Sequence, residues 1–257
     1  MSFALAVKLF AAPTLIGLAS LAGKRWGPNI AGLLGGLPLV GGPVVLAIWL
    51  TDGPAIATRV ALAAPVGIWA TLCYLLVVGY ASARARWYVV IPLGWMCYLT
   101  VAVLLDRLGL AYSIPLGFII LPALWWAATR GLPKPSAPVF AAPLPKIELI
   151  ARILAAVALV LTLTTAADVL GPSLTGVLTG APVAATVIPA FTLAMAGRDA
   201  LLLALRGFLT GLMGFVVFFL ILGNTLPALG AWALLPALVV AVSVGLAATR
   251  AAKRAAG

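Results

Sequence analysis

Three observations predict that this sequence folds as an all-α polytopic membrane protein. Hydrophobic residues make up 65% of the 257 residues and charged residues only 8%, and the mean hydropathy is +1.23. A soluble domain carries roughly a quarter of charged residues, so soluble enzyme folds are excluded. The apolar runs are continuous rather than alternating with a period of two, which favours a helical bundle over a transmembrane β-barrel.

Nine apolar runs, each bounded by charged residues or by Gly and Pro, are predicted to be transmembrane helices. Crossing the hydrocarbon core takes about 20 apolar residues, so nine spans leave only short loops between them. The predicted spans are residues 3–23, 28–51, 56–80, 87–105, 110–129, 148–167, 171–195, 200–223 and 230–249.

The basic residues predict the orientation of these spans. The segments that follow the odd-numbered spans hold 13 of the 16 Lys and Arg residues. By the positive-inside rule the N-terminus is outside and the C-terminus is cytoplasmic. The net charge of +11 is then explained by topology and by contact with anionic lipid of the bilayer, and no nucleic-acid partner is expected.

An internal repeat runs through most of the chain. Residues 26–38, WGPNIAGLLGGLP, align without a gap with residues 170–182, LGPSLTGVLTGAP, at an offset of 144 residues. An odd number of crossings separates each span from its counterpart, so the second copy is predicted to be inverted. The same offset pairs Gly53 with Gly197, Gly67 with Gly211, Gly79 with Gly223 and Pro92 with Pro236.

The repeat divides the chain into four parts in a 4+1+4 arrangement of spans. Residues 1–109 form the first four-helix repeat, residues 110–129 a linking transmembrane helix, and residues 147–257 the second, inverted repeat. The longest loop, residues 130–146, is rich in proline. Proline forbids a helix there and favours an extended cytoplasmic connector.

The repeated unit resembles a known family. A span, then GP-x3-G-x3-G-x-P at the start of a second span, then two more spans is similar to the GlpM-like (YdgC-like) four-helix inner-membrane proteins. The chain resembles a fused inverted pair of them, joined by residues 110–129. The resemblance implies a multi-pass architecture in a bacterial-type inner (plasma) membrane, and it implies no biochemical activity.

The residue inventory argues against an enzyme. The chain has no His, which removes zincin-type motifs, His-carboxylate proton relays and imidazole-ligated metals. Cys73 and Cys97 lack CxxC spacing and are expected to pack as small apolar residues. No GxxxxGK[ST] motif is present for nucleotide hydrolysis. We therefore predict no catalytic residue, no metal and no cofactor.

All five acidic residues fall near predicted membrane interfaces rather than at mid-span. The facing carboxylates of a membrane protease or of a proton relay are thus not visible. Asp52 precedes Gly53 at a helix junction, where pairing with Arg59 is within reach. We expect Asp52 to be a coupling or gating residue, with an interfacial charge or a helix cap as the alternative.

Four basic residues lie inside predicted spans. Arg59 and Arg206 sit about a turn inside spans three and eight, close to equivalent positions near opposite membrane faces, and this fits an anion path. Lys8 and Arg152 are equivalent at the offset of 144 residues. Snorkelling of these side chains to the lipid headgroups is the alternative.

Two Gly- and Pro-rich stretches, residues 35–43 and 176–189, occupy equivalent positions in spans two and seven. Glycine weakens a helix and proline removes hydrogen-bond donors, so both helices are expected to break. Irregular backbone at membrane depth lines the substrate site of inverted-repeat transporters. The predicted substrate-binding residues are Asn29, Gly36, Pro38, Gly41, Gly42, Pro43, Arg59, Ser173, Thr175, Thr179, Gly180, Pro182, Thr186 and Arg206.

Close helix packing is the alternative for the glycines. Small residues four positions apart let two helices approach in any membrane bundle. We expect the glycines at that spacing to pack. We expect Pro38, Gly41-Gly42-Pro43 and Pro182 to break their helices. The spaced glycines are Gly32 with Gly36, Gly176 with Gly180, and Gly207 with Gly211.

The sequence thus predicts a secondary transporter for a small or lipid-linked solute, working by alternating access around broken spans two and seven. The basic residues inside the bundle favour an anionic solute. Two alternatives stay open: an ion channel with two-fold pseudo-symmetry, and a non-catalytic subunit or assembly factor of a larger complex. The lipid bilayer is the expected partner, and a homodimer or a partner subunit is left open.

Overall fold

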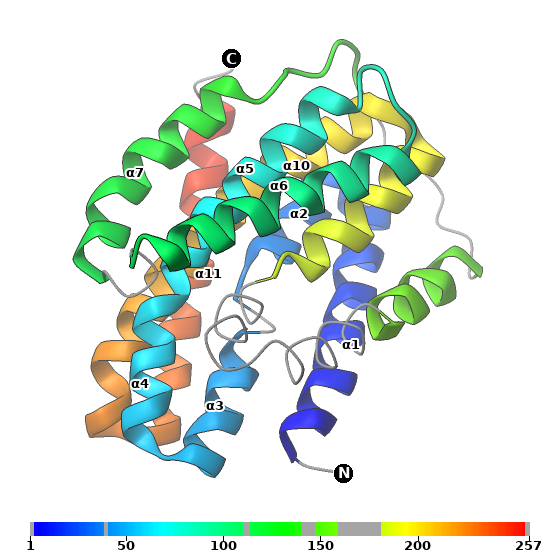
Figure 1. The fold of residues 1–257 in the computed structure, drawn as a ribbon. Helices are drawn as coiled ribbons and strands as arrows, with labels where there is room; N and C mark the ends of the chain where they lie inside the picture. Colours follow the sequence, from blue (N-terminus) through cyan, green and yellow to red (C-terminus); the bar gives the residue numbers. More distant parts are fainter. Residues whose placement is uncertain (1–2, 39–40, 110–113, 140–146, 159–180, 255–257) are drawn as a thin grey trace.

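The computed structural model describes residues 3–38, 41–109, 114–139, 147–158 and 181–254 (Figure 1). This part of the chain is all-helical and contains no strand, which confirms the all-α part of the predicted fold class. Three of its helices are long and apolar enough to cross a membrane, namely Pro54–Ala81, Trp87–Leu105 and Val183–Ala248. A membrane protein fits this finding, and the count of nine spans with its orientation stays a prediction.

The first part of the chain forms short helices that meet at glycines. Gly27 and Gly53 stand at two of these junctions with φ of 93° and 87°, a region that only glycine adopts readily. Each is followed by a proline at the first helical position, where the missing N–H costs nothing. The elements are α1 (Phe3–Trp26), α2 (Pro28–Gly36), α3 (Gly41–Asp52), α4 (Pro54–Ala63), η1 (Ala64–Val66), α5 (Gly67–Ala81) and α6 (Trp87–Arg107).

Predicted span three, residues 56–80, is not one unbroken helix. The 3-10 turn η1 separates α4 from α5 and contains Pro65. Proline has no N–H to donate to the preceding turn, so the α-helical ladder is interrupted there. Hydropathy does not register this interruption, because Pro65 lies within a continuous apolar run.

The second part of the chain is dominated by one long element with a sharp bend. Gly197 lies inside α10 with φ 82° and ψ −175°, so α10 is two helices, which we call the short arm (residues 183–196) and the long arm (residues 198–229). The elements are α7 (Ile114–Gly131), a helix over residues 147–158, α10 (Val183–Leu229), η3 (Gly230–Ala233) and α11 (Leu234–Arg254).

The bend at Gly197 turns the chain back on itself. A Cβ placed on Gly35 of α2 would lie 2.6 Å from Phe208 of the long arm and 3.2 Å from Ile188 of the short arm. In a straight helix those two residues would be roughly 30 Å apart along the axis. The 66 residues from Val183 to Ala248 would likewise be far too long for one crossing of about 30 Å.

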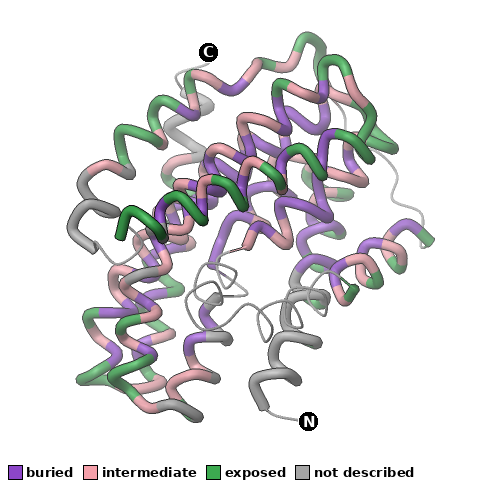
Figure 2. Tube along the Cα trace, viewed as in Figure 1, coloured by how far each residue is buried: buried purple, intermediate pink, exposed green. Residues whose placement is uncertain are grey.

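The long arm of α10 forms the centre of the molecule. It packs on α2, α4, α5 and α11, and buried residues concentrate on these contacts, whereas α7 is largely exposed (Figure 2). Gly79 of α5 approaches Leu205, near the start of the long arm, and Gly223, near its end, approaches Leu62 of α4. The α4–α5 segment and the long arm are therefore antiparallel neighbours.

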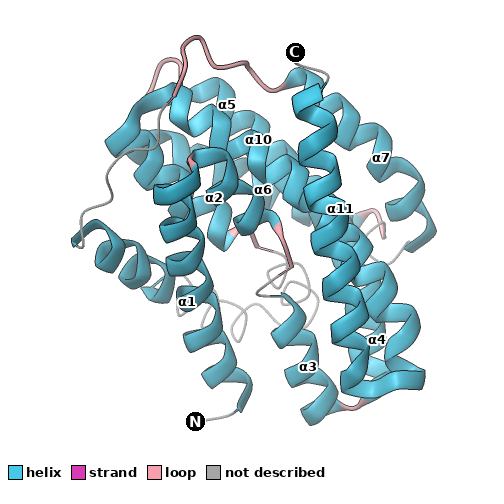
Figure 3. Cartoon of the chain, turned by 180° about the vertical axis from the view of Figure 1, so that it is seen from behind, coloured by secondary structure: helices cyan, strands magenta, loops and turns pink. Residues whose placement is uncertain are grey.

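The beginning of α1 and the end of α11 lie at opposite ends of the molecule, as both views show (Figures 1 and 3). The two buried clusters also lie at different levels of the α4–α5 and long-arm pair. One contains Leu75 and Leu205, and the other contains Ala61 and Phe219. The offset of 144 residues matches Leu205 to Ala61 and Phe219 to Leu75, so these positions of one cluster have counterparts in the other.

Candidate functional site

The first helix break lies in predicted span two. α2 ends at Gly36, and Leu37 is extended with φ −73° and ψ 156°. α3 then begins at Gly41, and the Gly42 N–H donates to the carbonyl of buried Pro38 at 3.0 Å. Backbone that leaves the helix here is buried in protein, which is the condition under which irregular structure persists inside a membrane.

Predicted span seven is non-helical at Ala181 and Pro182, the counterparts of Leu37 and Pro38, and we call this position the second break. Pro182 precedes the first helical residue of α10 and has non-helical φ −78° and ψ 58°. Thr186, one turn later, donates from its hydroxyl to the Pro182 carbonyl at 2.8 Å. The threonine thus satisfies a carbonyl at the start of the helix, as hydroxyl side chains do where a membrane helix is interrupted.

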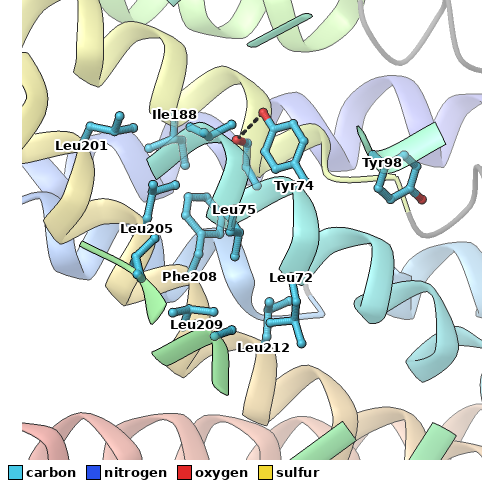
Figure 4. Packing of buried hydrophobic residues seen from close by; sticks show 14 of the residues in the cluster. Leu72, Tyr74, Leu75, Tyr98, Ile188, Leu201, Leu205, Phe208, Leu209 and Leu212 are labelled. Atoms are coloured by element: carbon cyan, nitrogen blue, oxygen red, sulfur yellow. Dashed lines mark hydrogen bonds between the residues drawn. The ribbon is translucent and has the colours of Figure 1, made fainter. Parts of the chain in front are cut away.

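Side chains from two other helices converge on Thr186, and we call this group the Thr186 network. Trp95 of α6 donates from Nε1 to the Thr186 hydroxyl at 3.0 Å. Tyr74 of α5 donates to the Ala185 carbonyl at 3.0 Å and lies 3.3 Å from the Thr186 hydroxyl. Figure 4 shows the Tyr74 hydroxyl directed at the short arm. The second break is therefore tied to α5 and α6 by polar contacts.

The Thr186 hydroxyl is occupied in this arrangement. It donates to the Pro182 carbonyl and accepts from Trp95 Nε1, and the Tyr74 hydroxyl, whose one proton goes to the Ala185 carbonyl, lies 3.3 Å away. A solute can therefore bind Thr186 only if the network opens. Hydrogen bonds that join three helices hold this conformation, so the network acts as a lock on the second break.

The first break has a matching contact without the polar atoms. Gly42 is the counterpart of Thr186, and Phe218 of the long arm is the counterpart of Tyr74, both at the offset of 144 residues. A Cβ placed on Gly42 would lie 2.9 Å from the Phe218 ring. The same pair of positions is thus in contact at both breaks, through hydrogen bonds at one and through apolar packing at the other.

The spaced glycines pack two helices together. A Cβ on Gly36 would lie 2.6 Å from the Phe208 carbonyl oxygen, and one on Gly207 would lie 2.7 Å from the Leu33 amide. The Asn29 carbonyl faces Gly207 in the same way. Both helices carry glycines four residues apart at this contact, so the packing interpretation holds for them.

The two arginines proposed for an anion path do not converge. Arg59 is exposed on α4. Arg206 donates from its NH2 group to the carbonyls of Leu132 and Pro133 at 2.7 and 3.3 Å. These carbonyls follow α7, where a helix end leaves acceptors unpaired and a cation is favourable.

Two further hydrogen bonds join the start of the Pro-rich connector to α5 and to the long arm. Tyr80 donates to the Gly131 carbonyl at 2.6 Å, and the Ser136 amide donates to the Asp199 carboxylate at 2.9 Å. Sequence reasoning missed both contacts, because they join segments that are far apart in the chain and carry no motif. Arg206 therefore binds the start of the connector to the long arm in this conformation.

The other predicted substrate-binding and gating residues lie in α3 or outside the described part of the chain. Gly41 and Pro43 fall in the first turn of α3, and Asp52 is its last residue, with its side chain outside the described part. Ser173, Thr175, Thr179 and Gly180 also lie outside the described residues. Within the described chain, no group of three or more His, Cys, Asp or Glu residues is placed to hold a metal ion.

No protein-family model, curated protein or solved structure matches the chain. The functional argument therefore rests on the geometry of the two breaks. Tyr74 and Trp95 were not predicted for this site. Tyr74 carried one usable signal, since it is a polar aromatic residue inside an apolar span, at the position where the other repeat has Phe218.

Proposed function

We propose that the protein is a secondary transporter made of two inverted four-helix repeats, and that it moves a small solute by alternating access around the two helix breaks. One observation carries this proposal: the described backbone is non-helical and buried at Pro38 in span two and at its counterpart Pro182 in span seven. Paired discontinuities of this kind form the substrate site in inverted-repeat transporters.

The moving parts are the two short helices that follow the breaks. α3 lies between the first break and Gly53, and the short arm lies between Pro182 and Gly197. Gly53 and Gly197 are counterparts at the offset of 144 residues and have φ of 87° and 82°. Each short helix is thus hinged at both ends, because a few terminal residues absorb the φ/ψ change when a rigid element swings.

The difference between the two breaks supports an asymmetric state. The second break is locked by the hydrogen bonds of the Thr186 network, whereas the first is held by packing of Phe218 on Gly42. Alternating access exchanges which break is open. Opening of the second break releases the Thr186 hydroxyl and the Pro182 carbonyl to the solute.

The solute class follows from the same contacts. Hydroxyl, indole N–H and carbonyl groups at the second break suit a small polar solute. An anionic or lipid-linked solute is the narrower proposal, and Arg206 could contact it only by exchanging the Leu132 carbonyl for the anion. The 4+1+4 topology, the bacterial-type inner-membrane location and the relation to GlpM-like proteins belong to this proposal.

Cysteine accessibility tests the proposal in membranes. In a background with Cys73 and Cys97 replaced by Ser, single cysteines at Leu37 and Ala184 mark the two breaks. Ala83→Cys and Leu108→Cys, exposed near the two ends of α6, are the labelling controls for the two sides. Alternating access predicts that an impermeant maleimide labels both break positions, in right-side-out and in inside-out vesicles.

Three results contradict or redirect the proposal. Protection of both break positions from both sides, with normal labelling at positions 83 and 108, contradicts a transport path. Labelling from both sides together with single-channel currents identifies a channel, since a carrier turns over far more slowly. Protection combined with loss of the folded chain in the absence of another protein favours a packing subunit.

A further inference from the structure

A buried ion pair lies outside the two breaks. Glu148 and Arg152 stand one turn apart on the helix over residues 147–158, and Arg152 donates from Nε and NH2 to Glu148 Oε1 at 3.1 and 2.6 Å. Only 6% of the Glu148 side chain and 8% of the Arg152 side chain are exposed. The sequence places these residues near a membrane interface, whereas the fold buries them.

The pair is enclosed by two helices that belong to the proposed transport path. Arg152 NH1 donates to the Ser20 hydroxyl of α1 at 3.4 Å, and its guanidinium carbon lies 5.4 Å from the Phe191 ring centre of the short arm. Ile153 packs against Gly17 of α1. The Glu148–Arg152 ion pair therefore lies between α1 and the short arm, which is hinged at both ends.

Glu148 is the only carboxylate on these three helices. Neither α1 nor the short arm contains Asp or Glu. The nearest further charges along these elements are basic: Lys24 is exposed one turn after Ser20, and Arg198 follows the Gly197 hinge. Among the residues of these three helices, only Glu148 neutralises the charge of Arg152. Loss of the Glu148 charge therefore leaves the guanidinium free to bind another anion.

Burial of this ion pair is not expected to raise the free energy of unfolding. Desolvation of two charges offsets most of their attraction, and apolar replacement of such a pair is often neutral or stabilising. Ionisable groups inside a membrane protein usually belong to a substrate or ion pathway. The counterparts of Glu148 and Arg152 in the first repeat are Ala4 and Lys8, so the acid is found in one repeat only.

We infer that Glu148 and Arg152 form a proton-coupled oxyanion site, an inference that rests on the proposed transport function. When Glu148 takes up a proton, its carboxylate loses its charge and Arg152 stays cationic. The guanidinium then binds a carboxylate or phosphate oxygen pair of the solute, the geometry that arginine fits best. Release of the anion returns the proton from Glu148 to water, so one proton accompanies one negative charge.

The short arm links this site to the second break. Thr186 and Phe191 are five residues apart on the arm, which puts them roughly 140° apart around its axis. One side of the arm therefore carries the Thr186 network and another side contacts Arg152. A swing of the arm changes both contacts together, so occupancy of the oxyanion site biases the opening of the break.

Binding to the purified full chain tests the inference without requiring transport. The probes are sodium phosphate and sodium acetate, added to protein in an uncharged detergent, with affinity read from the thermal midpoint at pH values from 5 to 8. Uptake of one proton with each acetate ion predicts affinity that rises as the pH falls, and phosphate, which itself changes charge in this range, is compared at a single pH. Phosphatidylglycerol in mixed micelles, without free oxyanion, distinguishes a lipid headgroup as the source of the anion.

Four variants separate the roles of the two residues. Glu148→Gln binds oxyanion with affinity that no longer depends on pH, and Arg152→Gln does not bind it. Arg152→Lys binds more weakly and keeps the pH dependence, because the charge remains and the bidentate geometry is lost. The double variant Glu148→Gln/Arg152→Gln leaves no unpaired buried charge and reports on folding alone. Arg107→Gln, at an exposed arginine at the end of α6, behaves as wild type.

Wild-type affinity that is unchanged by Arg152→Gln, or a pH dependence that survives Glu148→Gln, overturns the inference. Cysteine accessibility at the breaks is measured separately, so failure of the oxyanion site and failure of the transport proposal are distinguishable. In proteoliposomes that do transport oxyanion, the wild type acidifies the lumen as anion enters, and Glu148→Gln carries the anion without the proton.

Discussion

Thr186 shows how one hydroxyl can hold a helix break closed. It donates to Pro182 within its own helix start and faces donors from α5 and α6. Thr186 was predicted as a site residue because it is a hydroxyl residue in the Gly- and Pro-rich stretch of the second repeat. Its partners Tyr74 and Trp95 were not, because hydrogen bonds between separate spans leave no local pattern in a sequence.

Thr186→Val tests the lock, since valine keeps the shape and removes the hydroxyl. The Pro182 carbonyl and the Trp95 N–H are left unpaired in a buried setting, so the free energy of unfolding should fall by about 1–3 kcal/mol. Thr192→Val is the matched control, because Thr192 lies on the same arm and donates only to the Ile188 carbonyl. Unfolding in mixed micelles measures both, and an equal loss for the two variants would contradict a special role for Thr186.

Among the helices, glycines have two different roles: some form hinges between helices and others allow two helices to pack closely. Gly53 and Gly197 supply positive φ at the hinges, whereas Gly36, Gly207 and Gly211 let α2 and the long arm approach backbone to backbone. The sequence pattern predicted both kinds of position from Gly spacing and Gly-Pro pairs. The bend at Gly197 lies between predicted spans seven and eight, residues 171–195 and 200–223, so the pattern also predicted its position.

Gly197→Ala tests the hinge. At φ 82° and ψ −175° a Cβ is strained whatever space surrounds it, so stability should fall by about 1–3 kcal/mol and the bend should relax. Gly131→Ala is the control, since its added Cβ meets only the Leu76 side chain at 3.6 Å and glycine-to-alanine changes at ordinary φ are close to neutral. Thermal midpoints in detergent compare the two, and the account is wrong if Gly131→Ala is the more damaging change.

Gly207→Ala tests the close approach of α2 to the long arm. The added methyl group meets Leu33 backbone at 2.7 Å, and backbone cannot yield as a side chain can, so a loss of about 1–3 kcal/mol is expected from overpacking. Gly245→Ala, whose Cβ would touch only Leu33 and Leu37 side chains at 3.5 and 3.6 Å, should be nearly neutral. Denaturation in mixed micelles that ranks Gly245→Ala as the worse variant would contradict the packing scheme.

The whole molecule is organised by the offset of 144 residues. Gly53 and Gly197 share one backbone conformation, and the contact of Tyr74 with Thr186 has its counterpart in Phe218 and Gly42. Composition and hydropathy were enough to predict the all-helical class, because both are summed over many residues. The roles of Arg206 and Glu148 were not predictable in this way, since each depends on which distant segment happens to lie against it.

The central claim is that α3 and the short arm are hinged helices that move in opposite senses between two states. Spin labels on Leu50→Cys and Met195→Cys, two exposed positions near the ends of these helices, report their separation by pulsed electron resonance in nanodiscs, with Cys73 and Cys97 replaced by Ser. The account predicts two distance populations, whose ratio changes with pH and oxyanion in the wild type and not with Arg152→Gln. A single narrow distance under all these conditions would contradict it.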